Sequence, residues 1–228
     1  MIQNHRGITD LIVSVCAIAI TGLAARREFL KRHEPPPVAL RAIANWHEVL
    51  DGGHLVYGPA DAPVKVIEFG DFECGSCAEA TKELRQLVDR HPKLIAVIYR
   101  HYPLRELHQH AYLAAVASEC AAIQGAFRTY HDLLFGDQQS IGRVPWTDFA
   151  ARARVPDTIR FRNCLGEVLA RERVARDTDL AYRLGVRMTP TFVLNGNVLL
   201  GSYPAREQWD WLVTALAAKA SVPPIAKR

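Results

Sequence analysis

The sequence lacks several features that would place it in common functional classes. It has no glycine-rich loop of the kind that cradles phosphates, no zinc-finger spacing of cysteines and histidines, and no internal repeat. Its formal net charge of +4 is small for 228 residues and comes from arginines spread along the chain. This weak, dispersed charge argues against a dedicated nucleic-acid binder, so we predict no nucleic-acid partner. The length suits one domain, with or without a tail.

Long uncharged runs are also scarce, and the clearest lies near the start, at Leu11–Ala25. Positive charge precedes it at Arg6, which is the layout of a secretory signal. The run is shorter than the roughly 20 residues that span a bilayer comfortably. We therefore predict a signal peptide or a membrane anchor at residues 1–25, and both interpretations stay open. A basic cluster follows the run: Arg26, Arg27, Lys31 and Arg32. By the positive-inside rule this cluster opposes export, but the cysteine chemistry described below favours export.

Cysteine is sparse, at five residues: Cys16, Cys74, Cys77, Cys120 and Cys164. Cys16 lies inside the N-terminal apolar run, which leaves four cysteines, or two pairs, for the folded part. An even number in an exported chain fits an oxidising compartment.

The folded part begins with a strand, helix and strand in succession. Val64–Phe69 is β-branched and apolar, which predicts a buried strand. Cys74-Gly75-Ser76-Cys77 follows it, and 78–90 has helical spacing of apolar residues. Residues 94–99 predict a second strand. The two cysteines therefore lie at the turn from a strand to a helix.

Helices are predicted to fill the middle of the chain, and a hairpin and a helix its end. The expected helices cover 107–122, about 127–136 and 167–184, with helix first turns near Pro145 and Pro156. Asn195-Gly196 is a strong hairpin turn signal between strands at 191–194 and 198–201. A last helix is expected near 206–218. Together these elements predict an α/β protein with one mixed sheet and a helical block inserted between its halves.

The cysteine pair carries the predicted chemistry. A thiolate, not a thiol, attacks disulfides, and the free N–H groups and dipole at a helix start stabilise negative charge. Cys74 would sit at that start and Cys77 one turn deeper, so Cys74 is the expected nucleophile and Cys77 the resolving cysteine. A zinc site or a structural bridge are the alternatives for an isolated CxxC.

Several segments together resemble the DsbA-like group of the thioredoxin superfamily over about residues 56 to 218. They are Gly58-Pro59-Ala60-Asp61-Ala62-Pro63-Val64, Glu68-Phe69-Gly70-Asp71-Phe72-Glu73-Cys74-Gly75-Ser76-Cys77, Tyr99-Arg100-His101-Tyr102-Pro103-Leu104, Gln124-Gly125-Ala126-Phe127 with Tyr130-His131-Asp132, and Gly185-Val186-Arg187-Met188-Thr189-Pro190-Thr191-Phe192 with Asn195-Gly196. The resemblance implies a thioredoxin fold with an inserted α-helical domain, and dithiol–disulfide exchange with extracytoplasmic proteins. We accordingly divide the chain into the segment 1–25, a linker and N-terminal extension at 26–55 that includes Glu34-Pro35-Pro36-Pro37, and a domain at 56–222 with its helical insert at about 105–184.

The resemblance also assigns roles to residues outside the cysteine pair. Pro190 matches the family's cis-proline, which faces the cysteines, and would place the Thr189 backbone beside Cys74 to pair with a substrate segment. Glu68 matches the buried acid that relays the proton of the resolving cysteine. An ordinary trans proline and a solvent-paired strand carboxylate are the alternatives.

The resemblance similarly suggests a structural disulfide between Cys120 and Cys164, because several relatives carry cysteines at similar places. Such a bridge would close a loop of about 40 residues and stabilise the fold by roughly 4 kcal/mol. Two buried free thiols are the alternative.

The sequence departs from the strongly oxidising members just before the resolving cysteine. Those members carry His there, whereas Ser76 and its neighbour Gly75 supply no positive charge, and Glu73 adds a negative one. We expect Cys74 to be less acidic than in the strongest oxidants. Catalysis as an oxidase is favoured, and a reductase or isomerase stays open.

The expected partners follow from the resemblance: reduced or misfolded exported proteins as clients, and a membrane quinone-linked protein, DsbB-like or vitamin K epoxide reductase-like, as reoxidant. The expected location is periplasmic or extracytoplasmic, secreted or tethered by the N-terminal segment. We predict no cofactor and no resident metal. A rival of another class is a copper carrier using the cysteine pair with Met188 or a histidine, among which His101, His108 and His110 cluster in sequence. His131 lies on an apolar helix stripe and is expected to be a core residue.

Overall fold

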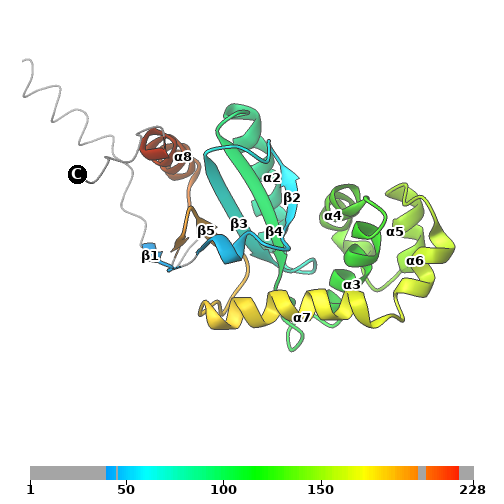
Figure 1. Cartoon of the computed structure of the whole chain (residues 1–228). Helices are drawn as coiled ribbons and strands as arrows, with labels where there is room; N and C mark the ends of the chain where they lie inside the picture. Colours follow the sequence, from blue (N-terminus) through cyan, green and yellow to red (C-terminus); the bar gives the residue numbers. More distant parts are fainter. Residues whose placement is uncertain (1–39, 45, 200–203, 221–228) are drawn as a thin grey trace, which may run out of the picture. The chain divides into compact units, whose positions relative to one another are not determined.

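In the computed structural model, which describes residues 40–44, 46–199 and 204–220, six strands form one mixed sheet (Figure 1). The strand order is β1–β6–β5–β3–β4–β2. The bounds are β1 Leu40–Ala42, β2 His54–Tyr57, β3 Val64–Gly70, β4 Ile95–His101, β5 Thr191–Leu194 and β6 Asn197–Leu199. The central strands β3 and β4 are parallel, and the other described pairs are antiparallel. Strand β3, which leads to the cysteine pair, therefore has a neighbour on each side.

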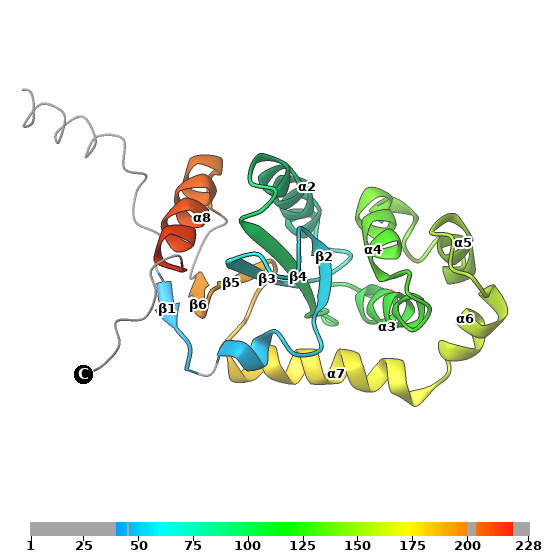
Figure 2. The same cartoon turned by 45° about the horizontal axis from the view of Figure 1, so that its top comes forward.

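Helices cover both faces of this sheet because β3 is apolar on both. Val64 and Val66 pack with α2 (Gly75–Arg90) and α8 (Arg206–Ala220) in one core cluster. Ile67 and Phe69 belong to a second cluster with α7 (Val168–Arg183) and the 3-10 turn η1 (Trp46–Val49). Successive strand residues point to opposite faces, which explains this division. Figure 2 shows α7 on the side of the sheet away from α2 and α8.

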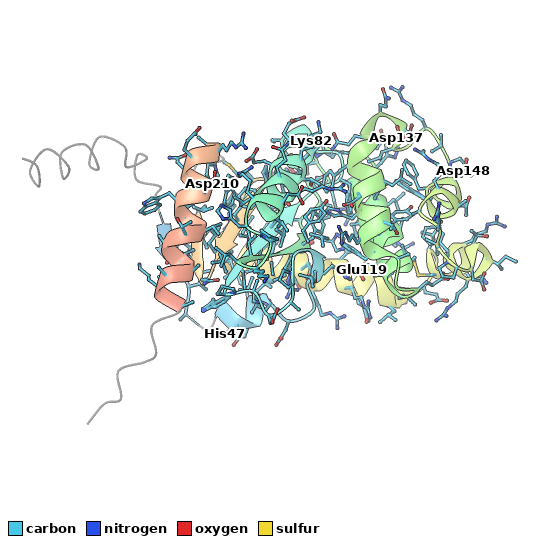
Figure 3. The ribbon with its side chains drawn as sticks, turned by 90° about the horizontal axis from the view of Figure 1, so that it is seen from above. His47, Lys82, Glu119, Asp137, Asp148 and Asp210 are labelled. Atoms are coloured by element: carbon cyan, nitrogen blue, oxygen red, sulfur yellow. A yellow bond between two sulfur atoms is a disulfide. The ribbon has the colours of Figure 1, made fainter. Side chains whose placement is uncertain are left out.

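An ion-pair cluster links the two helices of the first face. Asp210 on α8, labelled in Figure 3, accepts a hydrogen bond from Arg90 Nε at 3.0 Å. The same carboxylate lies 2.9 Å from His91 Nε2, just past the end of α2. These contacts hold the C-terminal end of α2 against α8, and so help to fix the helix that begins at the cysteine pair.

The segment between β4 and β5 is helical, as the sequence predicted. It contains α3 Ala111–Ala122, α4 Phe127–Gly136, the 3-10 turn η2 Gln138–Ser140, α5 Trp146–Arg152, α6 Thr158–Cys164 and α7. A disulfide joins Cys120 on α3 to Cys164 at the end of α6. The α/β fold class is confirmed: this is a thioredoxin fold with an inserted α-helical domain.

Some element bounds differ from those predicted. The helix expected from Leu107 begins at Ala111, and Leu107 is exposed in the preceding loop. A helix first turn was expected at Pro156, but α6 begins after Asp157, which is its N-cap. The Asp157 side chain accepts hydrogen bonds from the Ile159 and Arg160 N–H groups. Strands β1 and β2 and the turn η1 fall in the stretch expected to be linker and extension.

The predicted signal peptide or anchor at 1–25 and the proline linker at 34–37 lie outside the described residues. Part of the strand expected at 198–201 does so as well. In the described ranges, no helix combines the length and apolar character needed to cross a bilayer.

Candidate active site

Cys74 occupies the N-cap of α2, at the point where β3 gives way to the helix. The main chain turns there because Cys74 N–H donates to Asp71 O at 3.1 Å, and Cys74 O accepts from Cys77 N–H at 3.1 Å. Cys74 is 7% exposed and Cys77 is fully buried, while Gly75 and Ser76 are exposed. A partner molecule can therefore reach the first sulfur far more easily than the second.

The surroundings of the two sulfurs shift their pKa values in opposite directions. A hydrogen bond from the Cys77 thiol lowers the pKa of Cys74 to about 5, against the opposing effect of burial. The Ser76 hydroxyl, 3.2 Å from Cys74 Sγ, contributes further. Burial and the hydrogen bond to Cys74 raise the pKa of Cys77 well above its ordinary value. At neutral pH the reduced pair thus holds a thiolate at Cys74 and a thiol at Cys77.

Glu68 is a buried acid on the same side of β3 as the core valines. Glu68 is 1% exposed, and its Oε1 atom has no hydrogen-bond partner among the described residues. Burial, reinforced by the charge of Cys74, raises its pKa to about 8. The charge of Glu68 in turn contributes to the raised pKa of Cys77, which places the acid within electrostatic reach of the second sulfur. A protonated carboxyl group is therefore available near the buried thiol at neutral pH.

The loop before β5 meets the cysteine pair from the other side. The Thr189–Pro190 peptide bond is cis. The Cys74 thiol lies 3.5 Å from Thr189 O, in hydrogen-bonding geometry. Met188, one residue earlier, is 57% exposed. The structure thus brings Thr189 beside Cys74 and Cys77, as predicted from sequence, although Thr189 lies more than a hundred residues from that pair.

Several contacts of the site were not predicted from sequence. The Gln138 amide donates to Phe72 O at 2.8 Å and to Cys74 O at 3.0 Å, which joins the helical insert to the cysteine loop. The Asp71 carboxylate lies 2.9 Å from His108 Nδ1, and Glu73 accepts from the His110 N–H at 2.6 Å. Gln138 begins the turn η2, and the two histidines lie in the loop before α3. All three are distant from the cysteine loop in sequence, so only the charge of Glu73 before Cys74 could be noted from sequence.

The histidines that cluster in sequence have different hydrogen-bond partners. His101 Nε2 lies 3.0 Å from Glu119 Oε1, whereas His108 contacts Asp71, and His110 uses its backbone N–H. His131 is buried with its ring against Asp132, as expected of a core histidine.

One convergent group of metal-ligand types occurs within the described ranges, made by His54, His101 and Glu119. Glu119, labelled in Figure 3, accepts from His54 Nε2 at 2.6 Å and from Arg173 at 3.2 Å as well as contacting His101. Despite burial, these histidines lower the pKa of Glu119. The carboxylate is already paired with a guanidinium, so the group is a buried ionic network joining β2, β4, α3 and α7. It contains neither cysteine of the pair.

A cysteine pair at the start of the helix that follows a central strand, in contact with a cis-proline loop, defines a thiol–disulfide oxidoreductase of DsbA-like architecture. The family model Thioredoxin_4, described as thioredoxin, matches residues 50–213. The chain belongs to this thioredoxin family.

The chain is similar to two solved structures and to part of a longer protein. DsbA2 of Pseudomonas aeruginosa has 28% sequence identity and a TM-score of 0.56, covering 70% of this chain and 94% of that one. Oxidised BdbD from Bacillus subtilis has a TM-score of 0.63 at 20% identity, over 80% of this chain and 97% of that one, and is similar in fold. A Salinispora arenicola protein named Na(+)/H(+) antiporter NhaA 1 is 37% identical over 202 residues, which cover 85% of this chain. The chain spans 30% of the length of that antiporter.

Proposed function

We propose that this oxidoreductase acts outside the cytoplasm as an oxidase of protein thiols. The observation that carries the proposal is the environment of Cys74 at the N-cap of α2, where hydrogen bonds, first of all that from the Cys77 thiol, lower the thiol pKa to about 5. Stabilising the thiolate stabilises the reduced protein, and a stable reduced form makes the disulfide form a stronger oxidant.

The proposed reaction moves two electrons from a client to the cysteine pair, and of the two protons that the client thiols lose, one is matched by the proton that Cys77 takes up and the other passes to solvent. A client thiolate attacks Cys74 Sγ of the Cys74–Cys77 disulfide, and the bond between the two sulfurs breaks. Cys77 leaves with the electron pair and takes a proton. A second client thiolate attacks the client sulfur of the mixed disulfide, which forms the client disulfide and releases Cys74 as a thiolate. Cys74 is the more accessible of the two cysteines, at 7% exposure against none for Cys77, which supports this order of steps.

Two further groups have proposed roles in these steps. Glu68 would supply the proton to Cys77, because its carboxyl group is buried near the second sulfur and has a pKa of about 8. Thr189 and Pro190 would align a client segment beside Cys74 by backbone pairing, and the contact of Thr189 O with the Cys74 thiol supports this placement. Gly75 and Ser76 complete the loop, and a Cβ atom added at Gly75 would meet no atom within 4 Å.

The proposed clients are reduced or misfolded exported proteins. Continued turnover requires an oxidant for the reduced pair, for which we propose a membrane quinone-linked protein of the DsbB-like or vitamin K epoxide reductase-like kind. A place at a membrane surface is supported by the uncharged run at Leu11–Ala25 and by the similarity to a protein named as an antiporter.

The equilibrium potential of the pair against glutathione tests the direction of transfer. Thioredoxin combines a thiol pKa of about 7 with a potential of about −270 mV, and DsbA a pKa of about 3.5 with about −120 mV. A Cys74 pKa between these two predicts a potential of about −200 mV, together with rapid oxidation of a reduced, unfolded client by the disulfide form. A potential near that of thioredoxin, with efficient reduction of client disulfides, would instead assign the chain as a reductase.

A further inference from the structure

The buried carboxylate of Asp71 lies at the entrance to the cysteine loop. It comes directly after β3 and three residues before Cys74, and its side chain is fully buried. Oδ1 accepts from the Glu73 N–H at 2.8 Å, and Oδ2 accepts from the Leu104 N–H at 2.7 Å. The backbone oxygen of the same residue accepts from the Cys74 N–H. An unpaired negative charge in this position would disfavour a thiolate at Cys74.

His108 supplies the group that faces this charge. Its Nδ1 lies 2.9 Å from Asp71 Oδ2, and its ring is 27% exposed. The loop between β4 and α3 holds it in place, since the His108 N–H donates to Leu104 O at 2.9 Å. Burial lowers the pKa of His108, but the hydrogen bond and charge of Asp71, with smaller contributions from Cys74 and Glu73, outweigh it and raise the pKa above its ordinary value. The protonated ring is therefore favoured beside the carboxylate.

The neighbouring acid, Glu73, is engaged differently. Its carboxylate accepts from the backbone N–H of His110 at the start of α3. The His110 ring forms no ion pair within the described residues and packs near Gly142. Of these two histidines, only His108 directs its ring at an acid of the cysteine loop.

We propose that His108 is a positioning residue whose positive charge neutralises buried Asp71 and so favours the thiolate of Cys74. It thereby takes the electrostatic place of the cation that the Gly75-Ser76 dipeptide does not supply. The inference rests on the proposed exchange at Cys74. It adds that the oxidising strength of the pair is set from the loop between β4 and α3, and not only from the residues between the cysteines.

Three variants test this assignment. His108→Asn keeps a hydrogen-bond donor near the Nδ1 position but removes the charge, and His108→Lys restores a charge without the ring. His110→Asn is the matched control from the same loop. We expect His108→Asn to raise the pH midpoint of Cys74 ionisation, measured by thiolate absorbance, by about 0.5 to 1 pH unit. We expect the same variant to lower the equilibrium constant for oxidation of glutathione by the Cys74–Cys77 disulfide about three- to tenfold. We expect His108→Lys to recover most of this change and His110→Asn to leave both values unaltered.

A wild-type measurement covers the case in which a variant folds poorly. Linkage requires that a thiolate at Cys74 raise the pKa of His108 by as much as the charged ring lowers that of Cys74. The His108 ring, titrated by NMR, should therefore have a higher pKa in the reduced than in the oxidised protein. Equal His108 pKa values in both redox states, or equal glutathione constants in His108→Asn and the wild type, would overturn the inference. Failure of the proposed function is distinct, because it appears in the wild type alone, as a potential near that of thioredoxin or as no exchange with glutathione.

Discussion

Cys74→Ser reduces disulfide exchange to background, whereas Cys77→Ser halts the reaction after its first step and accumulates mixed disulfides. A serine hydroxyl cannot form the sulfur–sulfur bond, and the remaining thiol at Cys77 is buried with a raised pKa. In Cys77→Ser the acidic Cys74 still attacks a client disulfide, but no second sulfur resolves the product. Non-reducing electrophoresis and mass spectrometry after incubation with a disulfide-bonded client would measure both effects.

Ser76→Ala is the matched control for this pair of variants. It retains both sulfurs and removes only a hydroxyl 3.2 Å from Cys74 Sγ. We expect it to exchange at a rate within about tenfold of the wild type, because it removes one of several groups that stabilise the thiolate. Retained exchange in Cys74→Ser, or mixed disulfides attached through Cys77, would contradict the assignment of the nucleophile.

Loss of the disulfide between Cys120 and Cys164 is expected to cost about 4 kcal/mol of the free energy of unfolding. The bridge joins residues 44 apart in sequence and ties α3 to the end of α6. Without it, the unfolded chain gains the freedom of that loop, while both positions are buried in the native core. Since a whole domain is stable by only about 5–15 kcal/mol, the change is a large fraction of the total.

A Cys74→Ser/Cys77→Ser background isolates this effect, because reductant then acts on no active-site disulfide. Denaturant unfolding of the oxidised and reduced forms should show midpoints that differ in proportion to the lost free energy. A Cys120→Ala/Cys164→Ala variant on the same background should unfold near the reduced form. Identical midpoints in the presence and absence of reductant would show that the bridge does not stabilise the insert.

Local sequence was sufficient to predict the centre of the site. The β-branched strand ending at Gly70, followed by two cysteines and a helical pattern, predicts Cys74 at a helix start, and it is the N-cap of α2. Backbone preferences and side-chain alternation act over a few residues, so such patterns survive in the folded protein.

Contacts between distant segments could not be predicted in the same way. Strands β1 and β2 are three and four residues long, too short for a clear alternation. The pairing of Asp71 with His108 depends on where the loop after β4 folds back, which no local pattern specifies. From sequence, Glu73 is only a negative charge before Cys74, whereas in the fold its carboxylate accepts a hydrogen bond from the His110 N–H. The pKa of Cys74 is lowered first by Cys77 and Ser76 within the cysteine loop, whereas the partners of the two acids before it depend on the tertiary fold.

Titration of the reduced protein by thiolate absorbance tests the central claim most directly. A Cys16→Ala variant removes the one thiol outside the described residues, and Cys120 and Cys164 are bridged. Raising the pH should ionise one thiol with a midpoint near pH 5, at Cys74, while Cys77 stays protonated beyond its ordinary range. Two thiols that ionise together at the ordinary cysteine pKa of about 8.5 would contradict it.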